Sequence, residues 1–137
     1  MKKPIVLIKI GGSLITDKNK PFTLREKALQ VIAQEIKESF QKSGKSLIIG
    51  HGAGSFAHLP ARKYKTIQGA KTKKEFLGMA KVCDAACRLN RIVVAELIKT
   101  GLPAVSVNPF SSFLSKDFYL EKIFIDPLKE LLKNDLL

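Results

Sequence analysis

Apolar residues in the first fifty positions form two strand-like runs with a helical pattern between them. Residues 4–10 and 46–50 are short runs, PIVLIKI and SLIIG. Runs that stay apolar at successive positions predict strands buried on both faces, as in parallel sheets. The apolar residues between the runs recur at helical spacing: Leu29, Ile32, Ala33, Ile36 and Phe40. Strand, helix and strand in this order predict an α/β fold with a parallel sheet.

Helix-start signals precede two segments. Thr23 with Glu26, and Thr72 with Glu75, have the Thr-x-x-Glu form of a capping box. We therefore expect Thr23 and Thr72 to be the N-caps of two helices. A glycine follows the apolar pattern of each segment, and glycine commonly ends a helix.

The remainder of the chain adds one expected strand. Residues 59–71 are basic and without a regular period, which predicts an irregular connection. The second helix is expected to end near Thr100, a third strand to span residues 104–107, and a last helix to begin at an Asp-Pro pair at 126–127. Three strands make a small sheet, and no strand follows the last helix. We therefore expect the fold to be incomplete within residues 1–137.

Both strand runs pass directly into glycines. Residues 11–13 are GGS, and residues 50–55 are GHGAGS, in a loop expected to end on His58. The carboxyl ends of parallel strands meet at one edge of a sheet, where α/β proteins bind ligands. Glycine-rich backbone exposes N–H groups that can surround an anion. Neither segment has the spacing of a P-loop or a dinucleotide fingerprint, and a single glycine cluster is ordinarily a tight turn. Two of them, each closing a strand, predict a phosphate-handling site.

The charge balance supports an anionic ligand. The chain has 24 Lys and Arg against 12 Asp and Glu, a net charge of +12. Nucleic acid is the rival partner, but the lysines are scattered along helices and no arginine-rich tract is present, so solvated helix faces explain most of them. Lys9 differs because it lies in an apolar strand, where burial is costly unless an anion meets it. The alternative interpretation is that Lys9 lies at the end of the strand and extends its side chain to water. Lys18 is a weaker candidate because it lies in a polar loop, where lysine is common.

The histidines and cysteines are candidates of unequal weight. His58 could donate a hydrogen bond to a phosphate, although an isolated histidine is ordinarily a surface residue, whereas His51 is interpreted as structural. Cys83 and Cys87 share a helix face without further ligands nearby, so we interpret them as reduced thiols of an intracellular protein and assign no metal ligands. The short N-terminal apolar run fits neither a signal peptide nor a membrane span, which predicts a cytoplasmic protein without membrane contact.

Several segments together resemble a known family. Residues 9–13 (KIGGS), 16–18 (TDK) and 51–58 (HGAGSFAH) look like those of the isopentenyl phosphate kinases, within the amino acid kinase superfamily. Residues 104–109 (AVSVNP) are similar to the third-strand segment of that family. The KxGGS loop is shared across the superfamily, whereas the GSFxH ending marks the isopentenyl phosphate branch. The resemblance extends over essentially the whole chain.

The resemblance implies a three-layer α/β/α sandwich with a mainly parallel sheet. It also implies transfer of the γ-phosphoryl group of ATP, with Mg²⁺, onto the small-molecule substrate isopentenyl phosphate, giving isopentenyl diphosphate. The full-length enzyme is expected to be a homodimer that binds no nucleic acid. The nearest alternative is another amino acid kinase, for glutamate, aspartate or a nucleoside monophosphate. An alternative of a different class is a non-catalytic phosphate- or nucleic-acid-binding module.

The same resemblance assigns the candidate site residues. The ATP phosphates are held by Lys9, Gly11, Gly12, Ser13 and Ala53. The acceptor phosphate is held by Gly52, Gly54, Ala57 and His58. The isoprenoid tail lies against Phe76, Met79 and Val82, for which packing in the core is an equally weighted alternative. The catalytic residues are Lys9, Lys18 and His58, which suits a reaction that needs aligned phosphates and neutralised charge.

Two features depart from the family pattern. Ala57 stands where the family usually has glycine, and alanine would be strained there if the position required positive φ. Family members also carry about as much chain again, with a Gly-Asp strand and most of the adenine pocket. Residues 1–137 are therefore expected to be the N-terminal, acceptor-binding portion, truncated before the C-terminal nucleotide-binding portion. Activity of this portion alone is left open.

Overall fold

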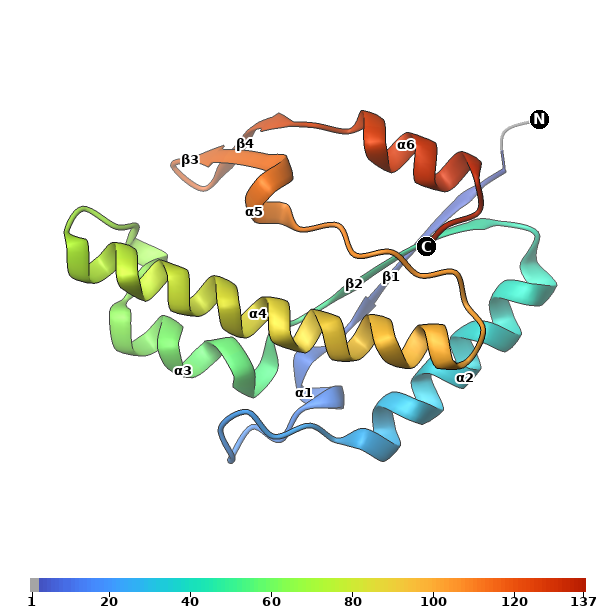
Figure 1. Ribbon diagram of the computed structural model, residues 1–137, viewed down its shortest axis with the longest axis horizontal. Coiled ribbons are helices and arrows are strands. Elements are labelled where there is room, and N and C mark those ends of the chain that lie inside the picture. Colours follow the sequence, from blue (N-terminus) through green and yellow to red (C-terminus); the bar gives the residue numbers. More distant parts are fainter. Residues whose placement is uncertain (1–2) are drawn as a thin grey trace.

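The computed structural model describes residues 3–137 and contains a two-stranded parallel sheet with helices packed against one face (Figure 1). Strand β1 (Ile5–Ile10) pairs with β2 (Ser46–His51), and Ile10 lies opposite His51. Helix α2 (Glu26–Ser43) joins the two strands and ends at Gly44, whose φ is 61°. The strand–helix–strand unit expected from the hydrophobic pattern is confirmed.

The core lies between this sheet, α2 and the long helix α4 (Lys73–Lys99). Its main side chains are Ile10 and Leu47 from the strands, Leu29, Ala33 and Ile36 from α2, and Leu89, Val93 and Leu97 from α4. The opposite face of β1 is open, since Ile5 and Leu7 are 57% and 71% exposed. The expectation that this strand is buried on both faces is wrong for residues 3–137, because helices cover only one of its faces.

Only one of the two predicted capping boxes is formed. The Thr72 hydroxyl accepts from the N–H of Glu75, whose carboxylate accepts from the N–H of Thr72 at 2.8 Å. The capping box predicted at Thr23 is not formed, because the N-cap of α2 is Arg25, whose side chain makes no capping hydrogen bond. The Arg25 N–H donates to the carbonyl of Ile15 at 2.8 Å, and this long-range bond fixes the backbone ahead of the helix.

The second glycine-rich loop is shorter than expected. Helix α3 spans Gly54–Tyr64 and is followed by the 3₁₀ turn η1 (Thr66–Gln68). The predicted irregular connection over residues 59–71 is therefore wrong for residues 59–64, which are helical. Proline normally interrupts a helix, yet Pro60 lies inside α3. His58 therefore sits on a helix and not at the end of a loop. Ala57 is also helical and free of positive φ, so alanine is unstrained there.

The third strand expected at residues 104–107 is wrong. A strand requires a neighbour for its backbone groups, and within residues 3–137 this segment has, apart from adjacent residues, only Leu137 as a backbone partner. The Val105 N–H donates to the Leu137 carbonyl at 2.8 Å, and the Leu137 N–H donates to the Pro103 carbonyl at 3.0 Å. These bonds are those of one rung of a parallel ladder.

The segment after residue 108 contains a hairpin that the sequence pattern did not predict. A short helix, α5 (Pro109–Ser112), precedes the antiparallel strands β3 (Phe113–Lys116) and β4 (Tyr119–Ile123). Asp117 and Phe118 form the turn with φ of 49° and 68°. Such turns usually carry Asn-Gly or Asp-Gly, so Asp-Phe gave no signal. The last helix, α6 (Asp126–Lys133), begins at the predicted residue.

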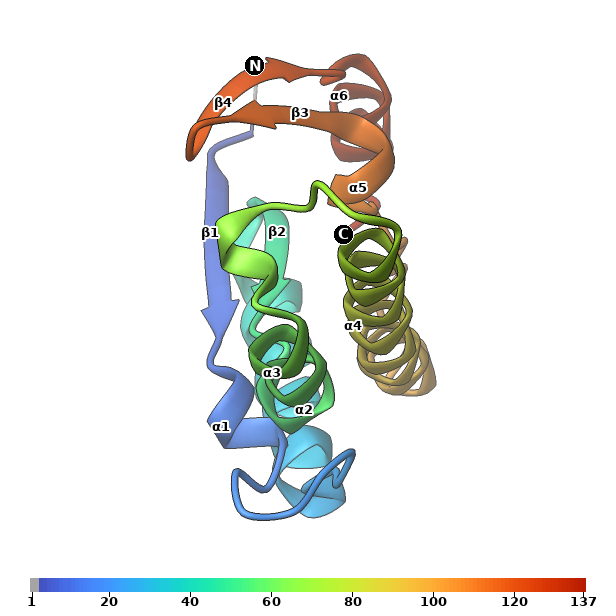
Figure 2. The ribbon, with the colours of Figure 1, turned by 90° about the vertical axis from the view of Figure 1, so that its left-hand side faces the viewer.

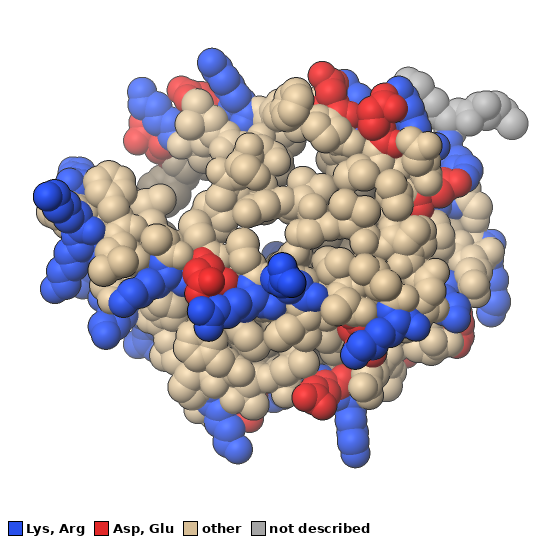
Figure 3. Space-filling view, viewed as in Figure 1, with Lys and Arg blue, Asp and Glu red and all other residues tan. Residues whose placement is uncertain are grey.

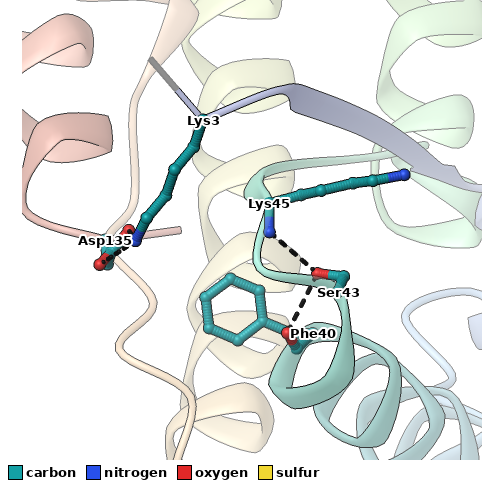
Figure 4. A network of polar contacts seen from close by, with 5 residues as sticks. All are labelled: Lys3, Phe40, Ser43, Lys45 and Asp135. Atoms are coloured by element: carbon teal, nitrogen blue, oxygen red, sulfur yellow. Dashed lines mark hydrogen bonds and ion pairs between the residues drawn. The ribbon is translucent and has the colours of Figure 1, made fainter. Parts of the chain in front are cut away.

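This C-terminal segment stands apart from α4, with both strands of its hairpin exposed (Figures 1 and 2). An ion pair at 2.6 Å joins Lys3 to Asp135, next to the end of α2, where the Ser43 hydroxyl donates to the Phe40 carbonyl (Figure 4). Both charged side chains are about half exposed, so the pair adds little stability. None of the helices within residues 3–137 combines the length and apolarity needed to cross a membrane.

Candidate phosphate-binding site

The two glycine segments touch through their backbones. We call residues 11–13 the first glycine turn and residues 52–54 the second. A Cβ on Gly12 would lie 2.5 Å from the nitrogen of Gly54, and a Cβ on Gly52 would lie 2.8 Å from the nitrogen of Gly12. Real Cβ atoms essentially never come that close, so only glycine permits the contact. The turns therefore lie together at the carboxyl edge of the sheet, as the parallel strands predicted.

Thr16 fastens the two turns to each other. Its side chain is fully buried, and its hydroxyl donates to the Gly12 carbonyl at 2.7 Å while accepting from the Ser55 N–H at 3.0 Å. The rings of Phe22 and Phe56 pack edge to face beside this point, 5.6 Å apart. Sequence reasoning gave Thr16 no role of its own. Its only signal was its place in the TDK motif.

Several backbone N–H groups of the turns are unused. Those of Gly12, Ser13, Ala53 and Gly54 meet no acceptor among residues 3–137. Gly52 differs, because its N–H donates to the last residue of β1 at 2.9 Å. The N-terminus of α3 adds the positive end of a helix dipole. The arrangement suits an anion, with Gly52 as a structural member of the second turn.

Lys9 and Lys18 are both exposed. Lys9 lies opposite Gly50 on β1 and on the open face of the sheet, so it does not bear the burial cost that the sequence argument assumed. Lys18 lies in the connection between α1 (Gly12–Ile15) and α2. Neither joins any of the ion pairs formed by the part of the chain that the structure describes. Both ammonium groups are therefore available to an external anion.

His58 is close to the second turn along α3. It follows Gly54 by four residues, which puts both on one helix face, and helical side chains lean toward the N-terminus. The contact between the turns keeps the Cα atoms of His58 and Lys9 within about 20 Å of each other. His58 is exposed, whereas Ala57 beside it is buried. Only the backbone of Ala57 is then available to a ligand.

The residues expected to hold an apolar tail lie on the first half of α4, beside α3 (Figures 1 and 2). The helices are in close contact at Gly78, where an added Cβ would collide with the side chain of Tyr64. Phe76 and Met79 are 56% and 38% exposed, and Val82 is half-buried. Core packing therefore does not account for Phe76 and Met79. Both present apolar surface that a ligand could cover.

Metal ligands are not grouped in this part of the protein. No three or more His, Cys, Asp or Glu residues within residues 3–137 are placed to hold an ion. Cys83 and Cys87 are half-buried free thiols. Burial, helped by the neighbouring thiol, raises the pKa of Cys83, which disfavours its thiolate form.

Lysines gather at the connection between α3 and α4, at the left-hand end of the molecule in Figure 3. A cavity of about 390 Å³ there is lined by Lys63, Lys65, Lys71 and Lys74 and by a single carboxylate, that of Glu75. The Glu75 carboxylate already accepts two backbone N–H bonds, which lower its pKa. The cavity is therefore electropositive.

Comparisons with known proteins give this geometry its context. Residues 4–137 match the family model described as the amino acid kinase family. An isopentenyl phosphate kinase of Methanocaldococcus jannaschii is 36% identical over 96% of this chain and 53% of its own length. One of Methanothermobacter thermautotrophicus is 35% identical over 80% of this chain and 42% of its own.

Solved structures agree with the sequence relatives. An X-ray structure of isopentenyl phosphate kinase superposes with a TM-score of 0.86 at 28% identity, covering 96% of this chain and 55% of that one. A substrate complex of isopentenyl phosphate kinase superposes with a TM-score of 0.79 at 26% identity, covering 97% and 53%. The chain thus spans about half the length of the relatives it matches, and the predicted fold class is confirmed. With a family match over residues 4–137 and two touching glycine turns on a parallel sheet, the chain belongs to the amino acid kinase family.

Proposed function

We propose that this chain is the acceptor-binding portion of an isopentenyl phosphate kinase, which transfers the γ-phosphoryl group of ATP to isopentenyl phosphate. The observation that carries the proposal is the backbone contact between the two glycine turns. Each turn closes a parallel strand, and each exposes unpaired N–H groups. Two anion cradles in contact would hold a donor and an acceptor phosphate near each other. The likeness to isopentenyl phosphate kinases along almost the whole chain supports this choice of acceptor.

In this proposal the first turn holds the terminal phosphates of ATP, and the exposed ammonium groups of Lys9 and Lys18 neutralise the charge of the transferring group. The second turn and His58 hold the acceptor phosphate. Phosphoryl transfer needs aligned phosphates and fixed positive partners more than covalent help. Buried bonds such as those of Thr16 fix the N–H groups in advance, which is how electrostatic stabilisation becomes effective.

The apolar surface of α4 suits the isoprenoid tail. Tyr64 is ten residues after Gly54, so the contact of Tyr64 with α4 lies about 15 Å along α3 from the second turn. Because α4 runs back along α3 from that contact, Val82 is the tail residue nearest the phosphate and Phe76 the most distant. An apolar tail would extend along α3 toward them.

The nucleotide side of the site is less complete. Ala53 contributes an unused N–H from the second turn, and we assign it to both phosphates: to ATP, and to the acceptor phosphate that the rest of this turn holds. Residues 3–137 contain no group of three or more His, Cys, Asp or Glu side chains placed to hold an ion, so Mg²⁺ would be held chiefly by the phosphates of ATP. We also propose that the complete enzyme is a cytoplasmic homodimer whose partners are small molecules.

A chimaera tests the proposal without assuming that this portion is active alone. Residues 4–137 would replace the matching residues of the M. jannaschii relative, which would supply the other half. We expect ATP-dependent phosphorylation of isopentenyl phosphate and none of glutamate, aspartate or uridine monophosphate. Preference for one of those acceptors would contradict the proposal.

His58 gives the sharper test within the chimaera. His58→Ala is expected to raise the KM for isopentenyl phosphate by about 10- to 100-fold, the effect of losing one hydrogen bond to a charged group, and to leave the KM for ATP within about two-fold. Leu59→Ala, an exposed neighbour, serves as the control and should change neither constant. Equal effects of His58→Ala on both substrates would remove its acceptor role.

The lysine-lined cavity favours a second candidate function, binding of a polyanion such as nucleic acid. Oligonucleotide binding by the 137-residue chain that weakens steeply with salt would support it. Negligible binding in low salt would dispose of it.

A further inference from the structure

We infer that His51 is a positioning residue that holds the peptide between Gly52 and Ala53 in the orientation that binds phosphate. The inference deepens the proposed function, on which the identity of the phosphate rests. It is carried by a polar chain that joins His51 to Asn90 on α4 and to Ser106 beyond it. His51 and Asn90 are half-buried, and Ser106 is exposed.

The hydrogen bonds among His51, Asn90 and Ser106 allow one consistent assignment of donors and acceptors when the imidazole is neutral. The Gly52 carbonyl can only accept, and it lies 3.2 Å from His51 Nδ1, so Nδ1 carries the hydrogen. Nε2 is then an acceptor, and the Asn90 side-chain amide nitrogen, 3.1 Å away, donates to it. The oxygen of that amide is left to accept from the Ser106 hydroxyl, which contacts it. The two ring nitrogens of His51, the Asn90 amide oxygen and the Ser106 hydroxyl thus each have a compatible partner.

The bond to Gly52 controls the direction of the next N–H group. In a planar trans peptide the C=O and the following N–H point in opposite directions. Holding the Gly52 oxygen toward the imidazole therefore turns the Ala53 N–H away from it. This N–H is one of the unused donors of the second glycine turn. A reversed peptide would present a carbonyl oxygen to the anion in its place.

Reversal is a realistic alternative at this position. Gly52 lacks the Cβ that would restrict its backbone, so the peptide after it is free to rotate unless something holds it. The Gly52 N–H is fixed by its bond to β1, whereas the one partner of its carbonyl among residues 3–137 is the imidazole. His51 supplies the missing restraint.

The polar contacts of His51, Asn90 and Ser106 also connect the second glycine turn to a distant segment. Asn90 lies in the middle of α4, and Ser106 lies in the stretch between α4 and α5. One helical turn from Asn90, the Asn108 amide contacts the Cys87 sulfur at 3.7 Å. The orientation of the second glycine turn is thereby tied to the segment that leads into the hairpin.

Three variants of the 137-residue chain distinguish the effect of the His51 hydrogen bonds from the effect of the size of its ring. His51→Phe keeps a ring and removes both nitrogens. His51→Asn places an amide N–H where Nδ1 was but is too short to reach Asn90. Cys87→Ala is the control, because it removes only the weak contact between its sulfur and the Asn108 amide and leaves the bonds that join His51, Asn90 and Ser106 intact. The readouts are the ¹⁵N spectrum of the His51 ring and the dissociation constant of isopentenyl phosphate followed at the Ala53 amide.

We expect the wild-type ring to carry its hydrogen on Nδ1, with Nε2 bare. His51→Phe should weaken binding about ten-fold, His51→Asn should recover it to within about three-fold of wild type, and Cys87→Ala should leave it unchanged. A hydrogen on Nε2 alone, or equal binding by wild type and His51→Phe, would overturn the inference. The ring spectrum of the wild type decides the matter even if His51→Phe does not fold.

Inorganic phosphate as a second probe distinguishes this inference from the proposed function. Binding of phosphate but not of isopentenyl phosphate would refute the proposed acceptor, and the same order of variants with phosphate would still support the role of His51. Failure of the wild type to bind either anion would overturn both.

Discussion

Replacing Thr16 by valine removes one hydroxyl from the point where the two glycine turns are joined, with almost no change in shape. The hydroxyl is fully buried and makes two hydrogen bonds, to the Gly12 carbonyl and from the Ser55 N–H. The Gly12 carbonyl would keep a second donor, the Thr16 N–H at 2.9 Å. The Ser55 N–H would be left buried without a partner. Losing one bond and stranding one donor together cost about 2–4 kcal/mol of unfolding free energy.

Urea unfolding of the 137-residue chain measures this loss. The control is Thr23→Val, because the Thr23 hydroxyl also donates to a backbone carbonyl, that of Pro21 at 3.0 Å, but near the surface. The control should stay within about 0.5 kcal/mol of wild type. Isopentenyl phosphate binding, measured in parallel, should weaken for Thr16→Val and stay unchanged for the control. Equal stability of the two variants would refute the view that Thr16 holds the turns together.

Further expectations concern single positions. Gly54→Ala should lower the free energy of unfolding in urea by roughly 3 kcal/mol or more, since the φ of Gly54 is +50° and an added Cβ would lie 2.8 Å from a carbonyl of the first glycine turn. Gly69→Ala should lower it by about 1 kcal/mol, because Gly69 has a φ of +82° but open space around it. Comparable costs would argue against the close contact. In the chimaera, Lys9→Met should lower kcat about a hundred-fold with unchanged melting temperature, and normal turnover would withdraw its catalytic assignment. Lys81→Met should raise the pKa of Tyr64, which a hydrogen bond from the ammonium group holds below its usual value; ultraviolet titration of the phenol measures this, and an unmoved pKa would contradict the bond.

The open face of β1 agrees with the partial coverage of the relatives. Ile5, Leu7 and Leu14 are more than half exposed on or beside this strand. Large contiguous apolar patches are unusual on monomeric proteins. The solved isopentenyl phosphate kinases are chains nearly twice as long, and this chain superposes on about half of their length.

Local signals in the sequence determined much of the secondary structure. The helical period of α2 and α4, the capping box at Thr72 and the glycine stop after Ser43 each depend on residues within about four positions of one another. The strand runs and the glycines that follow them are equally local. These features therefore followed from the sequence, and with them the prediction that two glycine turns share one edge of a sheet.

Tertiary structure decided the features that join distant parts of the chain. Thr16 and Ser55 are 39 positions apart, as are His51 and Asn90, and no short-range pattern marks either pair. The same holds for residues 104–107, whose sequence suits a strand but which have, among residues 3–137 and apart from adjacent residues, only Leu137 as a backbone partner. Backbone conformation is set largely by near neighbours, whereas the partner of a buried polar group is set by which elements pack together. The sequence by itself placed the two glycine turns at the ends of their strands, and only packing determined that the turns touch and what holds them there.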